Sequence, residues 1–241
     1  MKGRASAILA LAAAISAFPA VASPGSISAN VVLPFPSSGY EYREGLAPCT
    51  KLSELVAKPT IIELENYVFK DPASGERRMT GFTDVHAIYD FPIEAFIAAN
   101  TDYANYFRFV PRIFSSDIQT RTPGQCIMKY TVGISFLGFR VAYETLQETR
   151  AEPRADGSFL STSRLLDSPD GKLFEHYTSL YLATVIVDGK AMTYVRYFNR
   201  PGVRNPFPGM LTVSRTFTPG ESRAQVTALA KEAAKRIVPK P

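Results

Sequence analysis

Apolar and polar residues alternate through the middle of the chain. Within Gln125–Arg150, every second residue of Cys126–Phe136 is apolar, and the alternation resumes in Phe139–Tyr143 after the connecting pair Leu137-Gly138. A period of two over this length is typical of β-strands that have one face covered. The pattern therefore predicts long antiparallel strands joined by a tight connection.

Turn-forming residues divide the segments that follow. Asp156-Gly157, Asp170-Gly171 and Asp188-Gly189 separate stretches that are rich in β-branched and aromatic residues. Asp-Gly pairs between such stretches favour hairpin turns. Together with Gln125–Arg150 they predict a meander of about five strands.

The residues before this meander predict a hairpin and two short helices. Thr60–Lys70 and Arg77–Phe91 flank turn-forming residues, so they are predicted to pair as strands. Pro92 suits the first position of a helix. Pro111 ends the second short helix and begins the sheet.

Helical spacing and prolines characterise three other segments. Thr50–Lys58 predicts a short helix capped by Thr50. Glu221–Ile237 carries apolar residues at helical spacing and predicts a long C-terminal helix. Pro201–Pro219, which is rich in proline, predicts a loop that could cover a pocket as a lid.

A short motif accompanies the two short helices. Pro92–Phe96 opens the first helix, and Asp102-Tyr103, Tyr106 and Pro111 follow it. This motif and the order of the elements resemble the START-like helix-grip superfamily (SRPBCC), which includes polyketide cyclase/dehydrase-like and coenzyme-Q-binding-like proteins. The resemblance extends over about Val85–Ile237. The helices and strands expected in this region follow from the hydrophobic pattern alone and do not depend on the resemblance.

The resemblance implies an α+β fold. In that fold a curved antiparallel β-sheet wraps around the long C-terminal helix, and two short helices follow the first core strand. We expect this domain at residues 60–241, preceded by an N-terminal arm and short helix at residues 23–59. Ser23–Phe82 and the proline-rich Pro201–Pro219 depart from the pattern of small members of the superfamily.

The N-terminus predicts a signal peptide at residues 1–22. Lys2 and Arg4 precede the apolar segment Ala5–Phe18, and Ala20-Val21-Ala22 has the form of a cleavage site. We expect cleavage before Ser23 and a periplasmic or secreted protein. An uncleaved anchor helix is the alternative, but the apolar segment is shorter than the about 20 residues that a spanning helix needs.

Charge excludes one class of partner. Without Lys2 and Arg4 the chain has 25 basic and 22 acidic residues, a net charge of +3 instead of +5. The basic residues are scattered, and no basic stripe with interleaved aromatic residues indicates nucleic-acid binding. The small positive charge leaves room for transient contact with an anionic membrane surface.

A curved sheet cannot pack flat against one helix, so side chains must fill the gap or leave a hollow. Small-molecule pockets are mostly apolar with a few polar groups, and we expect a lipid or another hydrophobic small molecule there. Because the strand register is not fixed by the pattern, some of the candidate side chains can face outward. The candidates for ligand binding are Tyr130, Val132, Ile134, Phe139, Val141, Tyr143, His176, Leu180, Tyr194 and Arg196.

Two polar candidates have alternative interpretations. His176 could donate a hydrogen bond or act as a general base in the pocket, but we favour a structural histidine in a long strand. Arg196 could orient a ligand head group or belong to a solvated ion pair. His86 has no acidic residue clearly beside it, and we expect no catalytic role for it.

Cysteine and histidine spacing adds little chemistry. Cys49 and Cys126 could form a disulfide in an oxidising compartment, but the sequence does not show that they meet, and both states stay open. His86 and His176 lie far from both cysteines, so no spacing predicts a metal site. We find no phosphate-cradling glycine loop and expect no cofactor.

Three hypotheses about function follow. We prefer an exported binding protein that holds a lipid or another hydrophobic small molecule between the sheet and the C-terminal helix. The second hypothesis is a cyclase/dehydrase-type enzyme that uses His176 with Glu175 or Arg196. The third is a structural or interaction protein whose cavity is filled by side chains.

Overall fold

The computed structural model describes residues 42–46, 51–136 and 139–237, with the side chains of residues 134–140 left out. Its described strands form one antiparallel sheet in the order β1-β2-β8-β7-β6-β5-β4-β3. The strands are β1 (Thr60–Lys70), β2 (Arg77–Tyr89), β3 (Ile113–Thr122), β4 (Gln125–Phe136), β5 (Phe139–Pro153), β6 (Phe159–Asp167), β7 (Leu173–Val187) and β8 (Lys190–Arg204).

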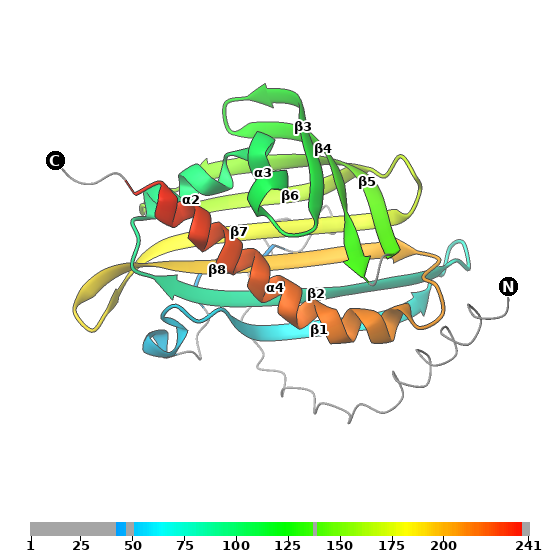
Figure 1. Cartoon of the computed structure of the whole chain (residues 1–241), viewed down its shortest axis with the longest axis horizontal. Helices are drawn as coiled ribbons and strands as arrows, with labels where there is room; N and C mark the ends of the chain where they lie inside the picture. Colours follow the sequence, from blue (N-terminus) through cyan, green and yellow to red (C-terminus); the bar gives the residue numbers. More distant parts are fainter. Residues whose placement is uncertain (1–41, 47–50, 137–138, 238–241) are drawn as a thin grey trace, which may run out of the picture.

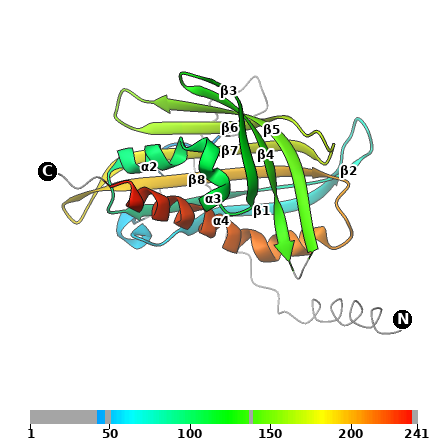
Figure 2. The same cartoon turned by 45° about the horizontal axis from the view of Figure 1, so that its top comes forward.

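The helices lie mainly on one side of this sheet. Helix α4 (Met210–Lys235) crosses the concave face diagonally, and the sheet curls upward beside it at β3, β4 and β5 (Figure 1). Helix α2 (Ile93–Asn100), the 3-10 turn η2 (Tyr103–Asn105) and α3 (Tyr106–Phe109) connect β2 to β3 and lie next to α4 (Figure 2). The predicted α+β fold, with a curved antiparallel sheet around a C-terminal helix, is confirmed.

Packing between β2, α2 and α4 forms the main core. Val85 and Ala87 of β2 face the helices, and Phe96 of α2 and Ala230 of α4 are buried against them. The small alanine side chains let α4 approach the sheet closely. The core therefore lies at the C-terminal end of α4 and leaves the region toward the other end of the helix less filled.

The prediction that Pro201–Pro219 forms a loop is wrong. Strand β8 extends into this segment, and α4 begins at Met210 and contains Pro219. A proline inside a helix costs about 3 kcal/mol, but Met210 and Leu211 pack against a buried cluster on β2, β7 and β8. Hydrogen bonds also join this first half of α4 to Asn66 of β1. These tertiary contacts outweigh the local preference of the prolines.

Gly202 explains why the proline-glycine pair at the start of this segment is part of a strand. A Cβ atom at position 202 would lie 2.3 Å from Cγ of Glu175 and 2.6 Å from Cζ of Phe174. The Thr80 hydroxyl donates a hydrogen bond of 3.1 Å to the carbonyl of Pro201. β8 thus approaches β7 at a distance that only glycine allows without a shift of the neighbouring side chains.

Other expectations differ in detail or fall outside the described residues. The sequence pattern did not predict β3. The described meander after the helices therefore has one strand more than the five that were expected. The helix expected at Thr50–Lys58 is only a 3-10 turn, η1 (Leu52–Leu55). The signal peptide and most of the N-terminal arm lie outside the described residues and stay predictions, as do the domain boundaries. No described helix combines the length and apolar character needed to cross a membrane.

Candidate ligand-binding cavity

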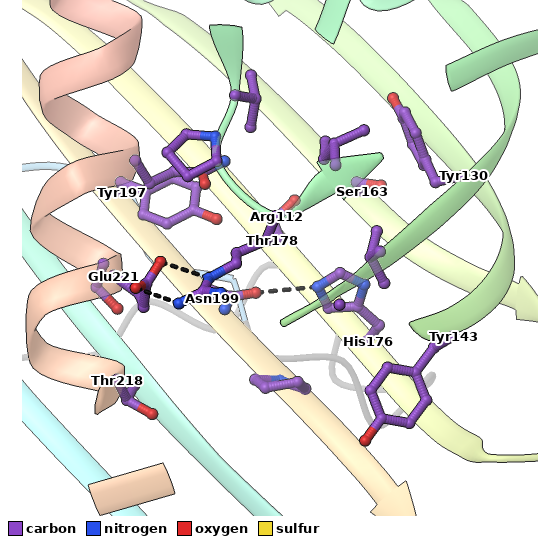
Figure 3. Close-up of a pocket in the computed structure, with 18 of the residues that line it drawn as sticks. Arg112, Tyr130, Tyr143, Ser163, His176, Thr178, Tyr197, Asn199, Thr218 and Glu221 are labelled. Carbon is purple, nitrogen blue, oxygen red and sulfur yellow. Dashed lines mark hydrogen bonds and ion pairs between the residues drawn. The ribbon is translucent and has the colours of Figure 1, made fainter. Parts of the chain in front are cut away.

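A cavity of about 360 Å³ lies between the concave face of the sheet and helix α4 (Figure 3). Strands β2 to β8 supply its walls, and the segment from the end of α2 to β3 and helix α4 as far as Leu229 close it on the other side. Most of its lining is apolar. The apolar side chains include Met79, Val110, Ile113, Val132, Val141, Leu173, Leu180, Val203, Phe207, Met210, Val213, Phe217, Val226 and Leu229.

Five tyrosines add aromatic surface to these walls. Burial raises the pKa of each, to about 12 for Tyr103, where the Ser161 hydroxyl opposes the shift in part. The other four shift in the same direction for the same main reason, so all five hydroxyls stay protonated at neutral pH. These four are Tyr106, Tyr130, Tyr143 and Tyr197.

Hydrogen bonds link polar side chains of four neighbouring strands into one chain along the cavity wall. Gln147 of β5 donates through Nε2 to Nδ1 of His176 on β7 at 2.9 Å. Nε2 of His176 lies 3.0 Å from Oδ1 of Asn199 on β8. On the other side, the Ser163 hydroxyl of β6 donates to Oε1 of Gln147 at 3.0 Å, and Thr149 donates to Ser163 at 3.2 Å.

This polar chain assigns the protonation state of His176. Because the Gln147 amide nitrogen can only donate, Nδ1 of His176 must accept, and Nε2 carries the proton that it donates to Asn199. Burial lowers the pKa of His176, and the hydrogen bond to Asn199 opposes this only in part. His176 is therefore neutral at neutral pH, and both of its ring nitrogens are occupied.

Two buried polar groups of cavity-lining residues make no well-formed hydrogen bond among the described residues, although the Ser161 hydroxyl lies close enough to one of them, on Tyr103, to oppose the rise in its pKa. They are the Tyr103 hydroxyl and the side-chain amide nitrogen of Asn100. Both residues are more than nine-tenths buried. Leaving a buried donor unpaired costs free energy, and a ligand that reached these two groups would remove that cost.

One ion pair joins the two sides of the cavity. Arg112, between α3 and β3, donates through Nε to Oε2 of Glu221 on α4 at 2.6 Å, and Nη2 of Arg112 donates to Oε1 (Figure 3). The pair is bidentate, which is the strongest arrangement of guanidinium and carboxylate groups. About a third of each side chain is exposed. The pair therefore ties α4 to the start of the sheet at the cavity.

The structure places six of the ten predicted ligand-binding residues on the cavity wall. They are Tyr130, Val132, Val141, Tyr143, His176 and Leu180. Ile134 of β4 and Phe139 of β5 have side chains outside the described part of the structure. Whether any of the ten binds a ligand stays a prediction.

The expectation that Tyr194 and Arg196 face the cavity is wrong. In β8, Tyr197 and Asn199 line the cavity, so the residues at even positions beside them face the opposite side of the sheet. Sequence reasoning did not fix this register. It also missed two polar residues on the cavity wall, Gln147 and Asn199. Gln147 lies four residues after Tyr143, and Asn199 lies two residues after Tyr197, so the alternation along each strand places both on the cavity face.

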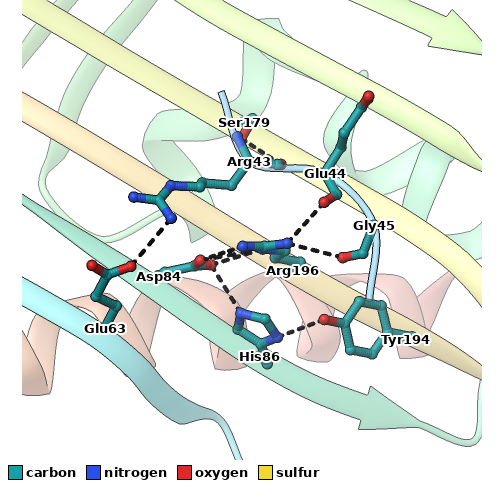
Figure 4. Close-up of polar contacts among 9 residues, drawn as sticks. All are labelled: Arg43, Glu44, Gly45, Glu63, Asp84, His86, Ser179, Tyr194 and Arg196. Carbon is teal, nitrogen blue, oxygen red and sulfur yellow. Dashed lines mark hydrogen bonds and ion pairs between the residues drawn. The ribbon is translucent and has the colours of Figure 1, made fainter. Parts of the chain in front are cut away.

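On the opposite face, Arg196 belongs to a buried polar network (Figure 4). Arg196 donates through Nη2 to Oδ2 of Asp84 at 2.6 Å and through Nε to Oδ1 at 3.1 Å. Nε2 of His86 is 3.0 Å from Oδ1 of Asp84, and the Tyr194 hydroxyl is 2.5 Å from Nδ1 of His86. The view that His86 lacks a neighbouring acid is thus wrong, because Asp84 lies two residues away on the same strand face.

Titration behaviour in this network follows from burial and pairing. Burial alone would raise the pKa of Asp84, but hydrogen bonds from His86 and Arg196 outweigh it and lower the pKa to about 2. Burial lowers the pKa of His86, although Asp84 opposes the shift. The network therefore holds one ionised carboxylate, one guanidinium and a neutral imidazole at neutral pH.

The segment Tyr42–Leu46 covers this network, and we call it the strap. Arg196 donates through Nη1 to the carbonyls of Glu44 (2.8 Å) and Gly45 (3.1 Å). The backbone of Arg43 exchanges two hydrogen bonds with the Ser179 hydroxyl. The Arg43 guanidinium lies 5.3 Å from the ring centres of both Phe82 and Phe198. The back of the sheet is thus occupied by the chain itself.

Neither the described cysteine nor any metal-binding group contributes chemistry to the described part of the cavity. Cys126 is buried on β4, and burial raises the pKa of its thiol. Cys49 lies outside the described residues, so the disulfide stays a prediction. Among the described residues, no group of three or more histidine, cysteine, aspartate or glutamate side chains is arranged to hold a metal ion.

Sequence comparison finds no relatives for this chain. No protein-family model matches it. No curated protein matches it significantly.

Solved structures with the same fold exist at low sequence identity. A STAR-related lipid transfer protein fragment from Xanthomonas axonopodis is 12% identical, with 73% of this chain and 98% of that chain covered at a TM-score of 0.50. Human StAR-related lipid transfer protein 5 is 11% identical, with 73% and 86% covered at 0.51. The Zhui aromatase/cyclase from Streptomyces sp. R1128 is 13% identical, with 66% and 97% covered at 0.50. The fold of this chain is therefore the START-like helix-grip fold.

Proposed function

We propose that this protein binds a lipid or another hydrophobic small molecule in the cavity beneath α4. The observation that carries the proposal is the cavity of about 360 Å³ with apolar and aromatic walls and a single chain of polar side chains. This composition suits small-molecule sites, in which apolar walls supply affinity and a few polar groups fix orientation. Two of the structural neighbours are named lipid transfer proteins, which supports the same class of ligand.

The proposed mechanism is sequestration. The apolar walls remove the ligand from water, and unpaired donors such as Asn100 and Tyr103 hold its polar end. In this mechanism α4 moves away from the sheet during exchange, and the Arg112–Glu221 pair is one of the polar contacts that resist the movement, together with the hydrogen bonds from α4 to Asn66. The segment Pro201–Pro219 cannot serve as a loop-like lid, because it is built into β8 and α4.

We also propose that the protein is exported and works in the periplasm or outside the cell. The support is the N-terminal sequence, with Lys2 and Arg4 before an apolar segment and a small-residue cleavage site. Loading and release would then bring it into transient contact with a membrane surface. The mass of the mature protein, recovered from the producing cell, tests the export step: a chain that begins at Ser23 supports it, and one that retains Met1 argues against it.

Bound lipid after expression tests the binding function. Mass spectrometry of an organic extract from the gently purified protein should detect a hydrophobic molecule in stoichiometric amount. Thr178→Trp on β7 places a large ring in the cavity and should abolish uptake of a fluorescent fatty acyl probe. Ile186→Trp on the same strand is the control, because Ile186 is 64% exposed. A clean apo protein that takes up no probe would contradict the proposal.

The other two hypotheses have less support. Both ring nitrogens of His176 are hydrogen-bonded, and Glu175 pairs with Thr80 and Arg200 instead of with His176. A proton-transfer set for a cyclase/dehydrase-type enzyme is therefore not assembled. If His176→Ala changed the products formed from a supplied polyketide, that conclusion would fail. The volume beneath α4 argues against a cavity filled by side chains.

A further inference from the structure

The charges around the cavity are few and paired. Among the described residues that line it, Arg112 and Glu221 are the charged ones, and they bind each other through two hydrogen bonds. The guanidinium keeps N–H groups outside this pair, but the two opposite charges compensate each other. The cavity therefore presents no net charge to a ligand, even though it contains a guanidinium and a carboxylate.

The interior polar groups are uncharged as well. The chain from Thr149 to Asn199 consists of hydroxyls, amides and the neutral imidazole of His176. The unpaired groups of Tyr103 and Asn100 are a phenol and a primary amide. Burial keeps the tyrosines protonated and His176 unprotonated. Such groups match a hydroxyl or a carbonyl, which needs one or two hydrogen bonds and no counter-ion.

A ligand with a charged head group binds less favourably in this cavity. An anion in the cavity would need a cation, because burying an unpaired charge is costly. The available cation is Arg112, and an anion that bound its remaining N–H groups would lie beside the carboxylate of Glu221, which repels it. A cationic head group bound to Glu221 would lie beside the guanidinium of Arg112, which repels it. Because about a third of each side chain is exposed, water weakens both effects without removing them.

We infer that the cavity selects an uncharged amphiphile, with a hydroxyl or carbonyl head and a hydrophobic body, and that Glu221 is the specificity-determining residue that disfavours anions by neutralising the charge of Arg112. This inference rests on the proposed function and goes beyond it, because it assigns the charge of the ligand and the residue that sets it. The strap and the network around Arg196 play no part, since they lie on the other face of the sheet.

Calorimetric titration of the full chain with 1-decanol and with sodium decanoate at neutral pH tests the inference, because these ligands share a hydrocarbon body and decanoate is ionised. The wild-type protein should bind decanol at least about tenfold more tightly than decanoate, the ratio that corresponds to one charge-assisted hydrogen bond. Glu221→Gln leaves the charge of Arg112 uncompensated and should raise the ratio of decanoate affinity to decanol affinity by about tenfold.

Two further variants separate charge from shape. Arg112→Gln with Glu221→Gln in one chain removes both charges and should restore the preference for decanol. Glu94→Gln is the matched control, because Glu94 is exposed on α2, away from the cavity, and its loss changes the net charge by the same amount. Circular dichroism establishes that each variant is folded.

Each outcome has one meaning. Equal or tighter binding of decanoate by the wild type, unaffected by Glu221→Gln, overturns the inference and leaves the proposed function standing. A gain of decanoate binding in Glu94→Gln that equals the gain in Glu221→Gln also overturns it, because the effect would then reflect overall charge. If the wild type binds neither ligand, the proposed function fails and the inference falls with it.

Discussion

Arg196 and Asp84 form a buried bidentate ion pair on the face of the sheet opposite the cavity, with Nη2 of Arg196 2.6 Å from Oδ2 of Asp84. The side chains are 1% and 0% exposed. Arg196 also holds the strap through two carbonyls. The pair therefore connects neighbouring strands, β2 and β8, to a segment far away in the sequence.

Removal of one partner from this pair should be strongly destabilising. Arg196→Met leaves the Asp84 carboxylate buried without its cation, and such losses cost about 3–5 kcal/mol. Chemical denaturation should show this decrease in the free energy of unfolding. Arg150→Met is the control, because Arg150 is half-exposed and Glu148 keeps Arg164 as a partner; it should cost less than about 1 kcal/mol. Equal costs for the two variants would contradict the role assigned to Arg196.

Stability should fall as the pH drops below neutrality. The chain contains two histidines, His86 and His176, and burial lowers the pKa of both from the ordinary value of 6.5. The unfolded chain binds these protons more readily, so the stabilisation is fully present above pH 6.5 and is lost as the pH falls through that value. Each histidine can contribute a slope of up to about 1.4 kcal/mol per pH unit.

The two histidines can be separated by mutation. His86→Gln and His176→Gln should each flatten the pH dependence of the unfolding free energy, measured by denaturation between about pH 7 and about pH 5. A wild-type curve that is flat over this interval would show that neither histidine changes its pKa on folding. Asp84 adds a separate loss at lower pH, because its pKa of about 2 in the folded protein lies below its ordinary value of 3.8.

Gln147 should matter both for stability and for the polar end of the ligand. Gln147→Leu removes the donor to Nδ1 of His176 and the acceptor for Ser163, and buried groups left unpaired cost about 1–3 kcal/mol. Binding of 1-decanol should weaken more than binding of decane, which makes no hydrogen bond. Gln119→Leu on the exposed part of β3 is the control and should change neither value. A parallel loss of both ligands would indicate that Gln147 shapes the wall without contacting the head group.

Two glycines should respond in opposite ways to the same substitution. Gly202→Ala forces Glu175 and Phe174 to move from β8, and strain of this kind costs about 1–3 kcal/mol. Gly220→Ala, inside α4, has no atom within 4 Å of the added Cβ and should stabilise the protein by up to about 1 kcal/mol. Thermal denaturation of the two variants measures both signs. Similar melting temperatures would mean that β7 and β8 can separate at Gly202 without cost.

The sequence predicted most of the sheet because local patterns specify it. The alternation in Cys126–Phe136 and the Asp-Gly pair at residues 188–189 correspond directly to β4 and to the turn between β7 and β8. Two of the candidates on these strands, Val132 and Leu180, line the cavity. These features depend on neighbours in sequence, which is why a single chain reveals them.

The remaining features depend on contacts between distant residues. Nothing near Met210 in the sequence announces that it packs against β2, β7 and β8, so the prolines around it indicated a loop. The Arg112–Glu221 pair joins residues that are 109 positions apart. Arg196 was assigned to the wrong face because β8 was read without its partners. The contact between Asp84 and His86 is different, because it is local. Two residues that are two positions apart on a strand lie on the same face, so the sequence could have predicted this contact.

The division of work between the two sides of β8 has an evolutionary consequence. Tyr197 and Asn199 point toward the hollow, whereas Arg196 and Phe198 anchor the strap. Substitutions that alter the cavity can therefore accumulate on one face of β8 while the contacts that hold the strap on the other face stay intact. A chain built in this way can acquire a cavity of different shape without first losing the stability of its fold.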